Sequence, residues 1–270
     1  MKILVGALAL AAVLAPAAAS AQSAPPTAPN DPALCTDRPT KANATCTVPA
    51  GHWQLETDLA NWSHASEGGV STDVLLAPNP TLKYGLSDKA DIEFNVAPYE
   101  EVRVTAGGAT HTESGVGDLF MRLKYAVVSN SNWSLSVIPY VKAPTAPHNV
   151  GNGKVEGGLA VPVSFNLPDK FSLTFGPELD SLENAALDGR HLNMVQLINV
   201  SRPVTDKIGV AVEYWNDQNW DPLGTVSQSS ADVAATYAVS NTLQLDVGAN
   251  FGLNAATPRS QLYVGVSRRW

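Results

Sequence analysis

The sequence predicts an all-β fold, a single antiparallel transmembrane β-barrel of about 12 strands with short periplasmic turns and longer outer loops. Three observations predict it. Apolar and polar residues alternate in a series of short stretches, and short polar turns alternate with longer loops rich in Gly, Asn and Ser. The chain also ends on an aromatic residue, Trp270, which continues the apolar stripe of the last stretch. Membrane barrels combine two alternating faces with turns of unequal length at their two ends.

The first residues have the pattern of a secretory signal peptide. Lys2 supplies a positive charge, residues 3–15 are apolar, and Ala19-Ser20-Ala21 forms a small-x-small cleavage site before Gln22. This apolar stretch is too short for a transmembrane helix, which needs about 20 residues. We therefore expect residues 1–21 to be a cleaved signal peptide that exports the chain to an oxidising compartment.

Residues 22–50 are expected to be a disordered or loop lead-in, because they are rich in Ala, Pro and polar residues and show no apolar period. Cys35 and Cys46 are the only cysteines. In an oxidising compartment they are expected to pair as one disulfide that closes a small loop. Their spacing excludes a redox CxxC pair, and no His or third Cys stands at ligand spacing, so no metal site is expected.

The barrel is expected over residues 51–270, where stretches of period two follow one another. In the first of them Trp53, Leu55 and Leu59 alternate with polar neighbours, as a strand with two different faces requires. The expected strands, in order, cover residues 53–59, 76–84, 92–96, 119–125, 135–141, 159–165, 171–175, 192–200, 208–214, 233–239, 243–251 and 262–270. Single-chain bacterial barrels have an even number of strands, and this series agrees with that rule.

The connections between these stretches alternate in length. Short turns with Asp or Asn, which favour turns by bonding their own backbone, are expected at residues 86–89, 129–132, 167–170, 204–207 and 239–242. Longer loops are expected at residues 63–72, 103–115, 144–154, 180–190, 216–227 and 254–259. Pro78, Pro80, Pro139 and Pro162 fall inside expected strands, and each removes a ladder donor. We expect these prolines near strand ends or bulges.

The composition argues against nucleic acid as a partner but leaves one alternative fold open. The net charge of −8 makes nucleic acid an unexpected partner. Charged residues make up 16% of the chain, below the quarter usual in soluble proteins. A soluble periplasmic β-protein with an apolar, lipocalin-like interior for ligands is the alternative, because the apolar faces could point inwards.

If the apolar faces contact lipid, the polar faces line a lumen. The candidate lumen residues are Glu56, Asp58, Lys83, Glu93, Asp118, Arg122, Lys124, Lys142, Glu213 and Asp246, with Asp91 and Asp232 on the same faces. Buried charges must pair or stay hydrated. These residues therefore form either a salt-bridge network that fills the interior or a polar pathway for a small solute.

The sequence offers no catalytic residue. The stretch His148-Asn149-Val150-Gly151-Asn152-Gly153 is faintly similar to the His-x-Ser-Asn-Gly of outer-membrane phospholipase A, but the nucleophilic serine is missing. No phosphate loop or dinucleotide fingerprint is present, and no cofactor is expected. We expect a protein that is not an enzyme, with a phospholipase-like barrel enzyme as the second alternative.

Several segments in sequence order resemble one family. They are Thr36-Asp37-Arg38-Pro39-Thr40, residues 48–57, residues 80–88, Gly115-Val116-Gly117-Asp118 leading to Leu123-Lys124-Tyr125, and Lys142-Ala143-Pro144-Thr145. Together they are similar to the transporter-like outer-membrane proteins of the family described as Putative MetA-pathway of phenol degradation. The resemblance implies a Gram-negative outer-membrane channel of porin or transporter type for a small molecule, hydrophobic or aromatic, which passes by passive or facilitated diffusion. It implies no catalytic or ligand residues. The expected partners are outer-membrane lipid, the assembly machinery that reads a terminal aromatic residue, and the small-molecule solute.

Overall fold

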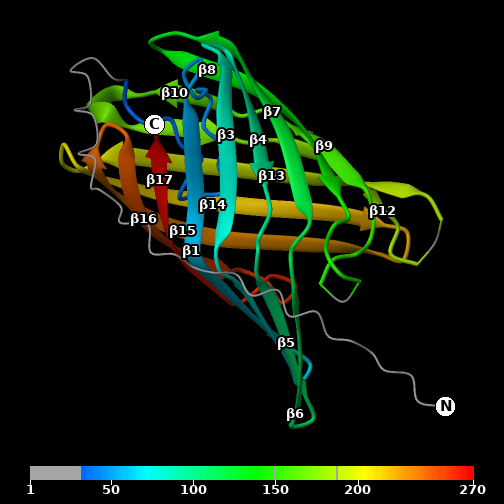
Figure 1. The fold of residues 1–270 in the computed structure, drawn as a ribbon. Coiled ribbons are helices and arrows are strands. Elements are labelled where there is room, and N and C mark those ends of the chain that lie inside the picture. The colour runs from blue at the N-terminus through cyan, green and yellow to red at the C-terminus, as the bar shows by residue number, and fades with distance from the viewer. Residues whose placement is uncertain (1–31, 149, 187) are drawn as a thin grey trace, which may run out of the picture.

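The computed structural model describes residues 32–148, 150–186 and 188–270, which form a closed β-barrel (Figure 1). The expected signal peptide, residues 1–21, and residues 22–31 of the expected lead-in lie outside the described residues. The elements are β1 (Trp53–Glu67), β2 (Val70–Leu76), β3 (Asn79–Ser87), β4 (Ala90–Asn95), β5 (Glu100–Ala106), β6 (Ala109–Gly115), β7 (Leu119–Ser129), β8 (Trp133–Ala143), β9 (Glu156–Ala160), β10 (Val163–Asn166), the short 3₁₀ helix η1 (Pro168–Lys170), β11 (Ser172–Phe175), β12 (Glu178–Glu183), β13 (Arg190–Pro203), β14 (Ile208–Asp221), β15 (Gly224–Ser240), β16 (Leu243–Gly252) and β17 (Ser260–Arg269). Within the described residues, no helix is long and apolar enough to cross a membrane.

The wall of the barrel has 12 antiparallel strands, as the sequence predicted. Five of these wall strands are each built from two consecutive pieces, namely β2 with β3, β4 with β5, β6 with β7, β9 with β10, and β11 with β12. The barrel closes between β1 and β17, where Gln54 lies opposite Arg269 and His64 lies opposite Ser260. Closure satisfies the backbone groups that a sheet edge would expose to lipid.

Prolines mark two of the breaks between these pieces. Pro78 separates β2 from β3, and Pro162 separates β9 from β10. Backbone hydrogen bonds still cross the breaks, since the amide of Ala77 donates to Tyr99 at 3.1 Å and the amide of Ser136 donates to Pro162 at 3.1 Å. The wall therefore kinks without opening. Pro80 follows close after the first break, whereas Pro139 lies inside β8.

Three stretches expected to be loops are largely strands. Residues 63–72, 103–115 and 216–227 extend the neighbouring strands into long hairpins, of which β5–β6 projects beyond the rest of the barrel (Figure 1). Two of the hairpins turn on glycine pairs, Gly68-Gly69 and Gly107-Gly108, whose φ angles lie between 57° and 82°. Glycine adopts these angles without strain, so the chain reverses over two residues and the strands continue to the turn.

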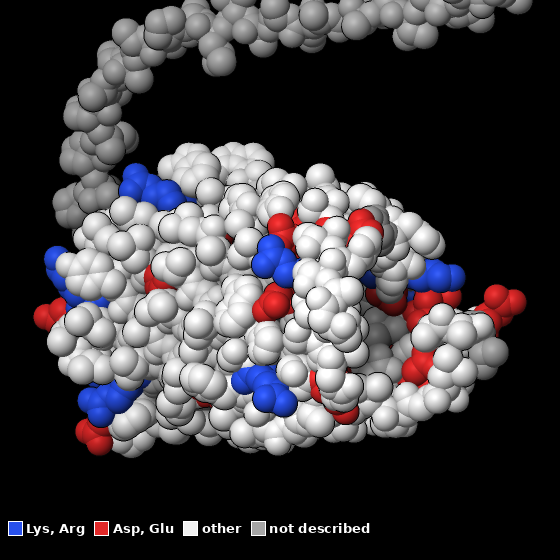
Figure 2. Space-filling view, turned by 90° about the horizontal axis from the view of Figure 1, so that it is seen from below, with Lys and Arg blue, Asp and Glu red and all other residues white. Residues whose placement is uncertain are grey.

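The two faces of the wall differ as a membrane barrel requires. Outward side chains are apolar and exposed, for example Leu192 at 58%, Val212 at 55% and Val247 at 54%. Inward side chains are polar and buried, such as Lys124 and Asp246. Figure 2 shows a broad surface without charge on one part of the wall, with Lys, Arg, Asp and Glu gathered towards its ends. An apolar interior of lipocalin type is therefore excluded for the described residues.

Candidate functional site

The lumen contains the chain that precedes β1. Residues 32–50, here called the plug, run inside the end of the barrel that carries the short turns and Trp270, here called the turn end. The disulfide Cys35–Cys46 joins the two arms of the plug, as expected. Hydrogen bonds from the wall hold both arms, among them Arg269 to the carbonyl of Ala33 at 3.3 Å and Thr45 with Ser134 at 2.6 Å. The expected lead-in is thus irregular in backbone, and its described part is packed within the barrel.

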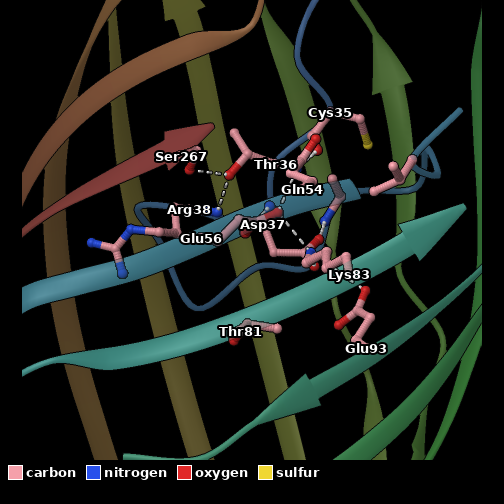
Figure 3. Close-up of polar contacts among 12 residues, drawn as sticks. Cys35, Thr36, Asp37, Arg38, Gln54, Glu56, Thr81, Lys83, Glu93 and Ser267 are labelled. Carbon is pink, nitrogen blue, oxygen red and sulfur yellow. Dashed lines mark hydrogen bonds and ion pairs between the residues drawn. The ribbon is translucent and has the colours of Figure 1, made fainter. Parts of the chain in front are cut away.

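Asp37 of the plug completes a cluster of buried charges. Its two carboxylate oxygens accept hydrogen bonds from the Lys124 ammonium at 2.6 and 2.7 Å, and Lys83 also donates to it. Lys83 contacts Glu56 at 2.8 Å and Glu93 at 3.3 Å. The four wall side chains are almost completely buried, so each charge depends on its partners for solvation. Figure 3 shows Asp37 directed at Lys83 from above the strands that carry Glu56 and Glu93.

Arg38 points away from Asp37 and Lys83 (Figure 3) and binds two other carboxylates of the wall. Its guanidinium contacts Asp58 at 2.6 Å through Nη1, and Asp246 at 2.6 Å through Nη2 and 3.1 Å through Nε. The pair with Asp246 is the two-pronged arrangement that a guanidinium makes best. Gly265 faces this guanidinium, and a side chain at position 265 would collide with it. The Tyr263 ring lies 5.9 Å from the guanidinium carbon.

Lys41, at the innermost part of the plug, binds a third region of the wall. Its ammonium lies 2.6 Å from Asp232 and 2.9 Å from the Ser230 hydroxyl, and it stands 4.8 Å from the centre of the Trp215 ring. The amide of Lys41 donates to Glu213 at 3.0 Å, and the amide of Ala42 donates to the other oxygen of that carboxylate at 3.1 Å. The plug therefore supplies most of the hydrogen-bond donors to this acidic region, and Asn199 of the wall donates one more to Glu213 at 3.0 Å.

The remaining predicted residues lie nearer the other end of the barrel, here called the loop end. Lys142 contacts Glu156 at 2.6 Å and Asp118 at 3.4 Å. Arg122 lies over two neighbouring rings, with its guanidinium carbon 5.4 Å from the centre of Phe120 and 6.0 Å from the centre of Tyr140. Lys142, Asp118 and Glu156 form a second polar region, whereas Arg122 lines a small cavity together with Asp37, Arg38 and Asn43 of the plug.

The ten candidate lumen residues all face inwards, but they belong to several separate groups. The sequence missed the residues that join them, Asp37, Arg38 and Lys41, since no period marks an irregular segment. The signal available was charge, because these three are charged residues enclosed by two cysteines in a lead-in of low charge. Asp180 and Asn193, bonded at 3.0 Å, are further buried luminal groups outside the predicted set.

Cavities remain on both sides of the plug. One of about 530 Å³ lies between the plug and the turn-end wall, and its lining includes Ser134, Ser164, Thr174, Asn199 and Ser201. Another of about 850 Å³ lies at the loop end, lined in part by Glu156, Glu183, His191, Asp217 and Asp221. Both can hold water and small polar solutes. Nowhere in the described chain do three His, Cys, Asp or Glu side chains gather in a way that could hold a metal ion.

Comparisons with known proteins agree with this architecture. The family model described as Putative MetA-pathway of phenol degradation matches residues 36–270. None of the curated proteins compared with the chain matches it in sequence. Among solved structures, the COG4313 outer membrane channel from Pseudomonas putida F1 is 16% identical, with 84% of this chain and 98% of that chain covered and a TM-score of 0.67.

Two other barrels extend the comparison. The NanC porin is 10% identical, with 79% of this chain and 98% of that chain covered and a TM-score of 0.53. The β domain of the Bordetella autotransporter BrkA is 12% identical, with 83% of this chain and 100% of that chain covered and a TM-score of 0.50. A channel, a porin and an autotransporter domain share this fold, so the fold alone does not assign a function.

Proposed function

The chain belongs to the family described as Putative MetA-pathway of phenol degradation, and from this membership and the plugged lumen we propose that it is an outer-membrane channel for a small solute. The observation that carries the proposal is how the plug is held. Its wall contacts include the hydrogen bonds and ion pairs of Asp37, Arg38 and Lys41. Contacts of this kind can break and re-form, which a gate requires and a permanent filler of the interior does not.

The route follows the two cavities. A solute enters at the loop end, passes the polar region around Arg122 and Lys142, and leaves through the turn-end cavity lined by Ser, Thr and Asn. The ten predicted lumen residues then line the pathway, and eight of them also form ion pairs. In this proposal the solute passes by passive or facilitated diffusion, without a cofactor.

A small aromatic solute is favoured by the apolar surface at the loop-end entrance. The register places Val74 and Leu76 of β2, and Val102 of β5, on the luminal face of the wall, since Leu76 lies opposite Asn61 and Asn61 lies opposite the buried Tyr263. An apolar surface next to a polar lumen retains rings that carry one or two hydroxyls. The family description, which refers to phenol, supports the same class.

The fold supports the proposed location. We place the barrel in the outer membrane, with the turn end in the periplasm, lipid around its apolar face, and residues 1–21 removed as a signal peptide on export. Trp270, 57% exposed at the turn end, is then the signal for the assembly machinery. A phospholipase-like activity is not proposed, because the luminal groups are arranged as ion pairs and not as a nucleophile beside a base.

Two measurements test the channel. The protein from outer-membrane fractions should migrate differently on a detergent gel before and after heating, and a protein found only in the soluble periplasm would contradict the location. In planar bilayers the purified protein should give discrete conductance steps. Membranes that stay silent at every voltage would contradict transport.

The solute class has its own test. Catechol should interrupt the single-channel current more often than inositol, a ring of similar size without aromatic character. Val74→Ser with Val102→Ser should reduce these interruptions, whereas Val212→Ser on the lipid face should not. Equal interruption by the two solutes would refute an aromatic preference.

A further inference from the structure

Four carboxylates form an acidic stripe along one side of the lumen. They are Asp58, Asp246, Asp232 and Glu213, on β1, β16, β15 and β14, and each is 5% exposed or less. The wall side chains beside these four carboxylates carry hydroxyls, amides and aromatic rings. Among the described side chains, the cations that contact the stripe come from the plug alone, as Arg38 and Lys41.

The plug occupies the stripe as a ligand would occupy a binding site. The guanidinium of Arg38 is clamped between two carboxylates beside the Tyr263 ring, and the ammonium of Lys41 meets a carboxylate, a hydroxyl and the Trp215 ring. Carboxylates combined with aromatic faces are the groups with which proteins recognise organic cations.

A second observation shows that the stripe is not saturated by the plug. Asp232 is 2% exposed, and one of its oxygens bonds Lys41. Its other oxygen, Oδ1, has no hydrogen-bond partner among the described residues. A buried acceptor without a donor is costly, and a ligand with more donors than one ammonium would satisfy it.

We propose that the acidic stripe is a binding site for organic cations that carry guanidinium or ammonium groups, and that Arg38 and Lys41 occupy it as intramolecular ligands while the plug is docked. Such cations compete with the plug for the same carboxylates. The inference rests on the proposed function in one respect only, namely that a released plug leaves a conducting lumen.

The charge balance gives the direction of the electrical effect. On the opposite side of the plug, Lys83 and Lys124 keep Glu56 and Glu93 as partners even without Asp37. The acidic stripe keeps no cationic partner among the described side chains, because Arg38 and Lys41 leave with the plug. Removal of the plug cations therefore turns this side of the pore acidic, and the pore should then favour cations over anions.

Binding is tested with agmatine, which carries one guanidinium and one primary ammonium. Calorimetry of the detergent-solubilised, full-length protein should show agmatine binding to Arg38→Gln/Lys41→Gln about tenfold more tightly than to the unaltered protein, because the competing side chains are gone. The matched control is Arg202→Gln/Lys207→Gln, which removes two cations of the same turn-end cavity that do not contact the stripe. A heat-modifiable gel band shows that each variant is folded.

The outcomes separate the two proposals. Added Asp232→Asn and Glu213→Gln should abolish agmatine binding to the first variant. Failure of Arg38→Gln/Lys41→Gln to bind agmatine more tightly, or equal binding by the Arg202 and Lys207 control, would overturn the site. In bilayers, the first variant should pass K⁺ over Cl⁻ severalfold better than the unaltered protein. Silent bilayers together with agmatine binding would reject the channel and retain the site.

Discussion

The disulfide Cys35–Cys46 should hold the plug in its docked state, and its removal gives a measurable prediction. The bond joins residues separated by 11 positions, and it lies in the segment that carries Asp37, Arg38 and Lys41. A released plug without this link is a flexible chain, whereas a released plug with it is a small ring with fewer conformations. The disulfide therefore disfavours release, although it makes no contact with the stripe.

The size of the effect follows from the length of the ring. Closing a loop of this size removes entropy worth about 3 kcal/mol from the flexible state. If the docked plug is equally well packed in both forms, loss of the bond lowers the docked-to-released ratio by up to about 100-fold, since each 1.4 kcal/mol is a factor of ten. The flanking contacts Arg269 to Ala33 and Thr45 to Ser134 persist and limit the conformational freedom that the released plug gains. We therefore expect the docked-to-released ratio to fall by at least about tenfold.

Single-channel recording measures this ratio as the open probability. Dithiothreitol added at the turn end should raise the open probability of the unaltered protein, because Cys46 is exposed there to a reductant. Cys35→Ser/Cys46→Ser should show the raised value from the start and should not respond to dithiothreitol. The same open probability in the oxidised, reduced and double-serine proteins would refute the argument, and it would mean that the ion pairs alone keep the plug docked.

Three further substitutions test the faces of the wall. Val212→Arg places a charge on the lipid face of β14 at a cost of about 2–4 kcal/mol near the bilayer centre, so the fraction assembled in the outer membrane should fall on a detergent gel while Val212→Ala stays normal. Lys124→Met leaves Asp37 without its two-pronged partner and should cost about 3–5 kcal/mol. The heat-modified form should then appear at a lower temperature than for Lys89→Met in an exposed turn, and an unchanged temperature would argue against a structural role for the cluster. Arg122→Ala should change single-channel conductance, and an unaltered conductance with unaltered stability would remove this residue from the pathway.

The barrel could be predicted from the sequence because a strand has a period of two. Alternation alone places Val212 outside and Glu213 inside, and eight of the ten candidate lumen residues are buried. The rule failed at the loop end, where Gly68-Gly69 and Gly107-Gly108 were included in expected loops. A glycine pair is also a two-residue hairpin turn, and the strands on either side are too polar there to show an apolar stripe.

The plug could not be predicted, because its position depends on partners far along the chain. Arg38 meets Asp246, which is 208 positions away, and Lys41 meets Asp232. No local pattern records such a pairing.

The consequence for function is that the wall and the plug are complementary in charge. The wall carries more carboxylates than it can neutralise, and the plug carries the missing cations on a segment without regular structure. A wall evolved only for stability would pair its own charges or avoid burying them. The excess of negative charge on the wall is matched by the cations of the plug, and the proposed cation site follows from this complementarity.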